Sequence, residues 1–118
     1  MIFHIAVQAE WEAAARDGLY APPAFAAEGF IHCSARDQLI ATADLFYQGR
    51  HDLVLLLIDE SRLTAPLRYE VPAAANDTRA ASPFPHIYGP LNLGAVIRAE
   101  AFPCMADGSF GLPPGFDS

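Results

Sequence analysis

The chain has 118 residues, of which 53% are hydrophobic and 18% are charged, and its net charge is −7 at neutral pH. This length and composition fit one globular domain and exclude an intrinsically disordered chain. An acidic surface repels polyphosphate, which disfavours duplex nucleic acid and anionic membranes as partners. The composition therefore predicts neither a nucleic-acid nor a membrane partner, and it leaves a small-molecule ligand bound at a local site as the expected partner.

Cysteine usage and the N-terminal residues indicate the compartment. Two cysteines, Cys33 and Cys104, do not form a disulfide framework, and the first seven residues are too short for a signal peptide. The longest apolar run, residues 53–58, is far shorter than a membrane span. These features predict a cytoplasmic protein.

The N-terminal part predicts a strand, a helix and a loop. Residues 2–7 are typical of a strand, with His4 among small and apolar side chains on one face. Residues 8–17 predict a helix. Residues 19–27 contain two adjacent prolines and predict a loop, in which Tyr20 either lines a pocket or packs in the core.

Residues 28–34, with the sequence EGFIHCS, are the most informative stretch. They predict a strand that ends where a helix over residues 35–47 begins. Ser34 and Asp37 have the spacing of a capping box, which predicts Ser34 as the helix N-cap. Free backbone N–H groups at a helix start bind anions, so a polar site is expected from His32 to Ser34.

The second half predicts three more strands. The apolar residues 53–58 favour a central strand that is buried on both faces. Residues 67–71 alternate and predict a strand, which the proline at position 72 allows to be an edge strand. Residues 72–85 predict a long loop of the kind that often forms a lid or binding loop. Residues 95–102 predict the last strand.

Residues 84–92 form a second candidate site. Pro85 and the Gly89-Pro90 turn hold this segment at both ends. If the segment is extended, His86 and Tyr88 point to the same side and form the wall of a site. The alternative is a hairpin entry in which the tyrosine makes only a structural hydrogen bond.

The whole pattern predicts an α+β domain over residues 1–102, followed by a Pro/Gly-rich tail over residues 103–118 that is extended or partly disordered. The chain contains no Gly-rich phosphate loop and no Cys-x-x-Cys pair. Its histidines are not spaced as metal ligands on one helix, so no metal site is predicted.

These motifs resemble a mostly bacterial group of proteins, the domain-of-unknown-function family nine-five-two. The resemblance runs from residue 2 to about residue 97. It rests on the segments Ile2-Phe3-His4-Ile5, Glu28-Gly29-Phe30-Ile31-His32-Cys33-Ser34 with Gln38, Leu53 to Asp59 and Phe84 to Leu91, and on Trp11, Gly18-x-Tyr20 and Glu70.

The resemblance implies a distant relationship to ADP-ribosyltransferases. That fold has a mostly antiparallel split β-core with two main helices around an NAD-binding cleft. By their order along the chain, His4 and His32 match the first two positions of the His-His arrangement in RNA 2′-phosphotransferases. Glu70 or one of residues 86–88 would fill the third position.

The implied chemistry is cleavage of the nicotinamide–ribose bond, with NAD as the substrate. The implied catalytic residues are His4, His32, Glu70 and His86, and the implied ligand-binding residues are Tyr20, Ser34, Arg36 and Tyr88. Ser34 and Arg36, at the helix start, would bind the pyrophosphate. The acidic composition argues against RNA as an acceptor.

Three alternatives follow from the same residues. The first is a nucleotide-binding module without turnover, which a cleft without Glu70 would favour. The second is an enzyme with Cys33 as nucleophile and His86 as base, since His32 would point to the opposite face from its neighbour. The third is a structural protein in which His32 and His86 are buried and satisfy each other.

Overall fold

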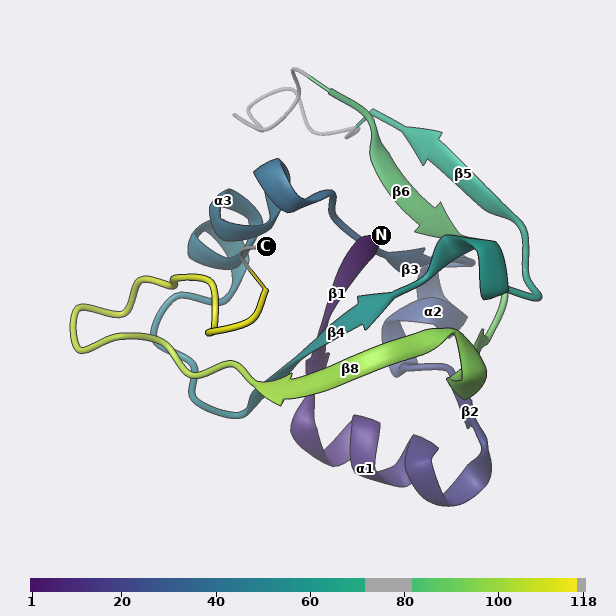
Figure 1. Cartoon of the computed structure of the whole chain (residues 1–118), viewed down its shortest axis with the longest axis horizontal. Coiled ribbons are helices and arrows are strands. Elements are labelled where there is room, and N and C mark those ends of the chain that lie inside the picture. The colour runs from purple at the N-terminus through teal and green to yellow at the C-terminus, as the bar shows by residue number, and fades with distance from the viewer. Residues whose placement is uncertain (72–81, 117–118) are drawn as a thin grey trace.

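The computed structural model describes residues 1–71 and 82–116, which form three antiparallel sheets and three α-helices (Figure 1). The elements are β1 (Ile2–Val7), α1 (Gln8–Asp17), β2 (Leu19–Tyr20), α2 (Pro23–Glu28), β3 (Ile31–His32), α3 (Arg36–Phe46), β4 (Leu53–Ile58), β5 (Leu67–Glu70), β6 (Phe84–Ile87), β7 (Leu91–Asn92) and β8 (Val96–Ala101), with short 3-10 helices at Glu60–Arg62 and Leu93–Ala95. The α+β class is confirmed.

Helix α2 was not predicted, because Pro22 and Pro23 were interpreted as loop residues. Pro22 precedes the helix in an extended conformation and Pro23 is its first residue. Proline is favoured at that position because the first N–H of a helix has no partner within the helix. The described residues therefore have a third helix in addition to the two predicted.

The first sheet has the strand order β1-β4-β8, which makes β4 its central strand. Val54 and Leu56 of β4 pack into one hydrophobic cluster, whereas Leu53 and Leu55 pack into another on the opposite face. The prediction of a central strand buried on both faces is confirmed.

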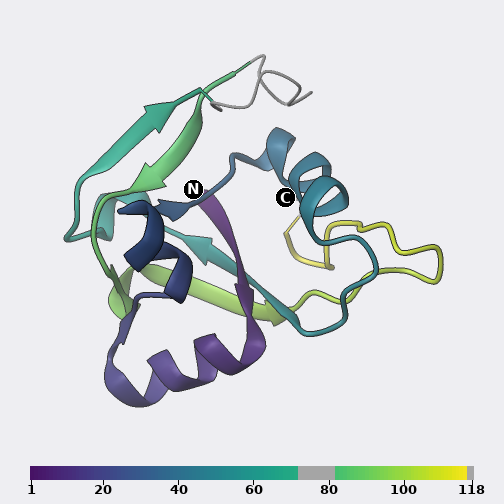
Figure 2. The same cartoon turned by 180° about the vertical axis from the view of Figure 1, so that it is seen from behind.

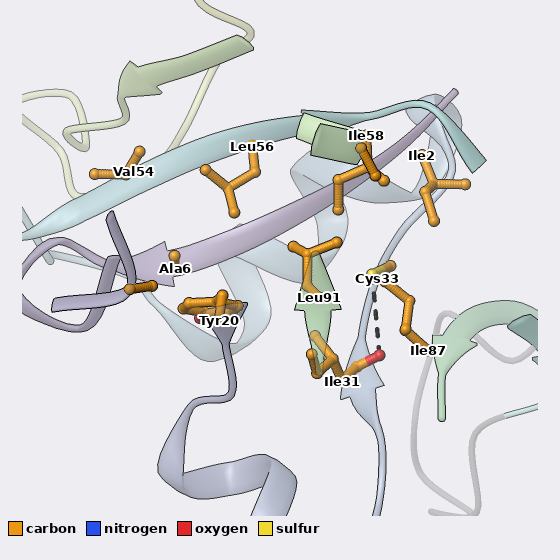
Figure 3. Packing of buried hydrophobic residues seen from close by; sticks show 12 residues of the cluster. Ile2, Ala6, Tyr20, Ile31, Cys33, Val54, Leu56, Ile58, Ile87 and Leu91 are labelled. Carbon is orange, nitrogen blue, oxygen red and sulfur yellow. Dashed lines mark hydrogen bonds between the residues drawn. The ribbon is translucent and has the colours of Figure 1, made fainter. Parts of the chain in front are cut away.

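The first hydrophobic cluster joins this sheet to the rest of the domain (Figure 3). Ile2, Ala6 and Leu56 come from the first sheet, and Ile31 and Ile87 come from a second sheet. Each of these side chains is at most 1% exposed. Because both sheets bury apolar faces in one cluster, the cluster fixes the position of the second sheet.

The second sheet has the order β3-β6-β5, with β5 at the edge as predicted. It is linked to β1 by backbone hydrogen bonds in both directions between Phe3 and Ser34, each 2.8 Å long. Part of the predicted loop over residues 72–85 belongs to β6, which begins at Phe84, and residues 72–81 lie outside the described part of the chain.

The backbone pairing of Ser34 explains why the predicted helix cap is wrong. Helix α3 begins at Arg36, and its N-cap is Ala35. The side chain of Gln38, rather than that of Asp37, reaches back and accepts a hydrogen bond from the Ala35 N–H at 2.8 Å. Because the bridge to Phe3 holds Ser34 extended, the helix starts after it.

Residues 103–116 contain no helix or strand, but they pack on the domain. Phe110 and Phe116 are buried in the second hydrophobic cluster with Phe3, Leu39 and Phe102. Figures 1 and 2 place this C-terminal segment beside α3. The residues assigned to a separate tail therefore contribute to the core up to residue 116.

Candidate functional site

One face of the second sheet gathers the polar residues of both informative stretches. His86 of β6 is the register partner of His32 on β3 and of Arg68 on β5. Side chains alternate between the faces of a strand, so Glu70 and Tyr88 fall on the same face as these three residues. The opposite face carries Ile31 and Ile87, which are buried in the core.

This face borders a cavity of about 440 Å³, a volume in the range of small-molecule sites. Helix α3 supplies Thr42 and Phe46 to the cavity, and Tyr47 follows directly after the helix. The other described lining residues are Phe3, His4, Ile5, Glu28, Phe30, His32, Cys33, Ser34, Glu70, Val71, Phe84, His86 and Tyr88. The cavity therefore brings together the residues of both predicted site segments.

Glu70 binds two of these side chains through one oxygen. Its Oε1 accepts hydrogen bonds from His86 Nδ1–H at 2.7 Å and from the Tyr88 hydroxyl at 2.5 Å. These two bonds hold the pKa of Glu70 below its usual range, and the bond to Glu70 raises the pKa of Tyr88. Because Nδ1 of His86 donates to the carboxylate, Nε2 is the ring atom that can exchange a proton with a ligand.

His32 forms a second histidine–carboxylate pair. Its Nε2 donates to Glu28 Oε2 at 2.6 Å, and both side chains are about half exposed. Gly29 ends helix α2 in the left-handed conformation, with a φ of 85°. Such a turn at the helix end returns the chain toward the helix, which lets the residue at position 32 contact Glu28.

Phe30 lies against both pairs. Its ring stacks on His86, with centroids 4.2 Å apart, and meets His32 edge-on at 4.7 Å. The two histidine rings are 5.1 Å apart. We call Glu28, His32, Glu70 and His86 the histidine–glutamate cluster. It holds two imidazoles at one cavity, each oriented by its own carboxylate.

His4 lines the cavity, but both of its ring nitrogens are used within the protein. Nδ1 is 2.5 Å from the His32 carbonyl oxygen, and Nε2 is 2.8 Å from the Tyr20 hydroxyl. A carbonyl only accepts, so Nδ1 carries the proton and Tyr20 donates to Nε2. Burial lowers the pKa of His4 from 6.5 to about 4. His4 is therefore neutral at pH 7.

The predicted ligand-binding residues lie in different places. Tyr88 and Ser34 line the cavity, whereas Tyr20 is 1% exposed, hydrogen-bonds His4 and borders a smaller neighbouring cavity. Arg36 does not line the cavity, and its Nη2 donates to the Phe116 carbonyl at 2.7 Å. The Arg36 side chain therefore binds the C-terminal segment outside the cavity.

Cys33 does not fit the role of a nucleophile. The residue is 3% exposed and belongs to the first hydrophobic cluster, where Figure 3 shows it with Ile31 and Ile87. Burial also raises the pKa of its thiol, which keeps the sulfur protonated.

Glu28, Phe30 and Tyr47 line the cavity but were not among the predicted site residues. A signal for Glu28 was present, because it lies four residues before His32 on the other side of a glycine. Tyr47 was predicted only as the last residue of the helix over residues 35–47. Its place in the cavity depends on how α3 packs on the first sheet, where Leu39 and Ala43 join the second hydrophobic cluster.

Two further features concern the described residues as a whole. Residues 1–71 and 82–116 contain no group of three or more His, Cys, Asp or Glu side chains that could hold a metal ion. No helix within these residues is both long and apolar enough to cross a lipid bilayer.

Comparisons with known proteins place the chain in a family. The sequence profile described as "Protein of unknown function (DUF952)" matches residues 5–99. The crystal structure of protein CC0527 from Caulobacter crescentus is 35% identical with a TM-score of 0.80, over 94% of this chain and 93% of that chain.

The solution NMR structure of CC0527 is 34% identical with a TM-score of 0.78, over 94% of this chain and 91% of that chain. A search of the curated proteins found no match. The descriptions of the solved structures name no activity, so the relationship to ADP-ribosyltransferases stays a prediction. The family match covers most of the chain, and the chain therefore belongs to the DUF952 family of proteins of unknown function.

Proposed function

We propose that the cavity is the site of an enzyme that breaks the bond between nicotinamide and ribose in NAD and passes the ADP-ribosyl group to water or to another acceptor. The observation that carries the proposal is that Glu70 lines the same cavity as His4, His32 and His86. A carboxylate facing the histidines favours an enzyme over a binding module. Cys33 and Cys104 are free thiols, which supports a cytoplasmic location.

Glu70 has the properties needed to stabilise the transition state. When the C1′–N bond breaks, its electron pair leaves with the nicotinamide nitrogen and positive charge develops on the ribose. Hydrogen bonds from Tyr88 and His86 keep Glu70 ionised, so a negative charge is fixed beside the place where positive charge appears.

The two histidines would have different roles in this step. His86 Nε2 would take the proton from water or from an acceptor hydroxyl as the new C1′–O bond forms. The Nδ1–H bond to Glu70 orients this ring. His32, with Nε2 held by Glu28, would direct Nδ1 toward a ribose hydroxyl or the nicotinamide amide.

One observation favours the alternative of a binding module without turnover. The described lining residues of the cavity include neither lysine nor arginine, so the cavity itself offers no cation to the pyrophosphate of NAD. In that alternative, a nucleoside or another phosphate-free metabolite would occupy the cavity, and no bond would be cleaved.

The test combines binding and turnover in the purified protein. Nicotinamide release from NAD is measured for the wild type, Glu70→Gln and His86→Gln, with Glu12→Gln on the exposed face of α1 as the control. Removing one transition-state charge or one acid–base group is expected to lower the rate by ~100-fold or more. Histidine-ring NMR signals are followed during titration with NAD and with ADP-ribose.

Saturable shifts at His32 and His86 with nicotinamide release would support the enzyme. The same shifts without release would support the binding module. The proposal is wrong if neither NAD nor ADP-ribose at millimolar concentration changes any signal of the cavity and no nicotinamide is released.

A further inference from the structure

A second cavity of about 220 Å³ adjoins the first. The two cavities share several lining residues, among them Phe30, His32 and Tyr47. Phe30 and His32 come from the segment around β3, and Tyr47 follows α3. A ligand that fills the first cavity and extends beyond it can therefore continue past His32 and Tyr47 into the second.

Arg50 distinguishes the second cavity from the first. Among the described residues that line either cavity, it is the only lysine or arginine. Its guanidinium lies 5.7 Å from the centre of the Tyr47 ring, and its side chain is 40% exposed. The turn after α3 holds it there, since the Arg50 N–H donates to the Tyr47 carbonyl at 3.0 Å.

We propose that the second cavity binds the pyrophosphate of a dinucleotide, with Arg50 as the phosphate-binding residue. This inference rests on the proposed function and assigns the phosphates of NAD to the second cavity. The first cavity contains the carboxylates of Glu28 and Glu70, which repel phosphate but suit the cationic nicotinamide ring. The second cavity is lined by Arg50 and by only one carboxylate among the described residues, that of Glu10.

The present partner of Arg50 leaves room for a phosphate. Nε donates to Asp52 Oδ1 at 2.9 Å and Nη2 donates to Asp52 Oδ2 at 2.6 Å. A guanidinium has five N–H groups, so others can still bind phosphate oxygens while Asp52 stays in place. The pair is about half exposed, and exposed ion pairs are weak enough for a dianionic ligand to compete.

The other lining residues of the second cavity suit the adenosine part of the ligand. Pro22, Pro23 and Phe25 line the second cavity and offer apolar surface to an adenine ring. The ligand would therefore occupy two subsites, with its nicotinamide riboside part at the histidine–glutamate cluster and its ADP part at Arg50.

The experiment compares a ligand that carries phosphate with one that does not. Dissociation constants of ADP-ribose and nicotinamide riboside are measured for the wild type, Arg50→Gln and Asp52→Asn. Arg98→Gln and Glu100→Gln are matched controls, because Arg98 and Glu100 form a similarly exposed pair two residues apart that lines neither cavity. Nicotinamide release from NAD and from nicotinamide riboside is measured in parallel.

We expect Arg50→Gln to weaken ADP-ribose binding about tenfold or more, the loss typical of one charge-assisted hydrogen bond. Asp52→Asn should strengthen it several-fold, since Arg50 then has no competing carboxylate. Neither variant should change the affinity for nicotinamide riboside more than about twofold.

Two results would overturn the inference: no ADP-ribose binding to the wild type, or the same ADP-ribose affinity in Arg50→Gln as in the wild type. Nicotinamide release in either case would leave the proposed function standing alone. Conversely, Arg50-dependent binding of ADP-ribose without any nicotinamide release would support the phosphate subsite and refute the catalytic proposal.

Discussion

The region around His4 and the histidine–glutamate cluster both contain histidine at the cavity, but the rings have different hydrogen-bond partners. His4 also lines the cavity, but one of its ring nitrogens is bonded to a backbone carbonyl and the other to Tyr20. His86 and His32 lie at a cavity, and each has one nitrogen on a carboxylate. Two neutral partners lock a ring in one protonation state, whereas one carboxylate partner leaves the second nitrogen for chemistry. His4 is therefore expected to contribute mainly to stability, and the proposed chemistry falls to His32 and His86.

The largest expected effect that separates the two regions is on stability. His4→Ala should lower the free energy of unfolding by about 3–4 kcal/mol, because it removes a buried ring and leaves the Tyr20 hydroxyl and the His32 carbonyl unpaired. His32→Ala, at an exposed side chain, should cost about 1 kcal/mol or less. Urea denaturation of both variants measures the difference. Equal losses would contradict this division of roles.

The next largest effect should be the contribution of His4 to the pH dependence of stability. Its pKa is about 4 in the folded state and 6.5 when unperturbed, so between these values the unfolded chain binds more protons. Stability should therefore fall by about 3 kcal/mol as the pH is lowered from 6.5 to 4, and the His4 contribution should be constant above pH 6.5.

Other groups also titrate in this range, so the measured quantity is the wild-type curve minus the curve of His4→Gln. Glu70 and Asp59, whose pKa values are lowered in the fold, lose their stabilising contribution in acid in both proteins. Parallel curves for the two proteins between pH 4 and 6.5 would show that His4 is not held neutral by burial.

A smaller effect is expected from the hydroxyl of Tyr20. Tyr20→Phe keeps the buried ring but leaves Nε2 of His4 without its donor, which should cost about 1–2 kcal/mol. Tyr69→Phe removes a hydroxyl from a half-exposed ring and serves as the control, with an expected change near zero. Thermal or urea unfolding gives both values. An unchanged free energy of unfolding in Tyr20→Phe would mean that the hydrogen bond adds no net stability.

The smallest stability effect should come from Glu28. Glu28→Gln breaks an exposed pair and should change the free energy of unfolding by about 0.5 kcal/mol or less. Nicotinamide release should still fall about tenfold, because His32 loses the charged acceptor that orients its ring. Unfolding and turnover are measured on the same sample. Unchanged turnover would remove His32 from the proposed mechanism.

Much of the candidate site could be predicted from local patterns. Alternation along residues 84–88 placed His86 and Tyr88 on one side, and the structure gives both a bond to Glu70. The apolar run of β4 predicted the central strand, because a strand buried on both faces needs apolar side chains at every position. Each of these predictions depends on neighbours within a few residues.

Other features depended on contacts between distant segments. A Ser-x-x-Asp spacing could not reveal that Phe3 would pair with the backbone of Ser34 and move the helix start to Arg36. Arg36 could not be excluded from the site until the C-terminal segment was placed against it. The composition of residues 103–118 indicated a tail, although Phe110 and Phe116 complete the second hydrophobic cluster.

The sequence by itself determined the α+β class, the central and edge strands, and the two segments that carry the polar residues of the cavity. Only the tertiary structure decided that His32 and His86 meet as register partners and that His4 is held between Tyr20 and the His32 carbonyl. The physical reason is the distance along the sequence over which each effect acts. Side-chain alternation acts between neighbours in the chain, but the pairing of β3 with β6 is set by burying Ile31 and Ile87 in a core shared with β1 and β4.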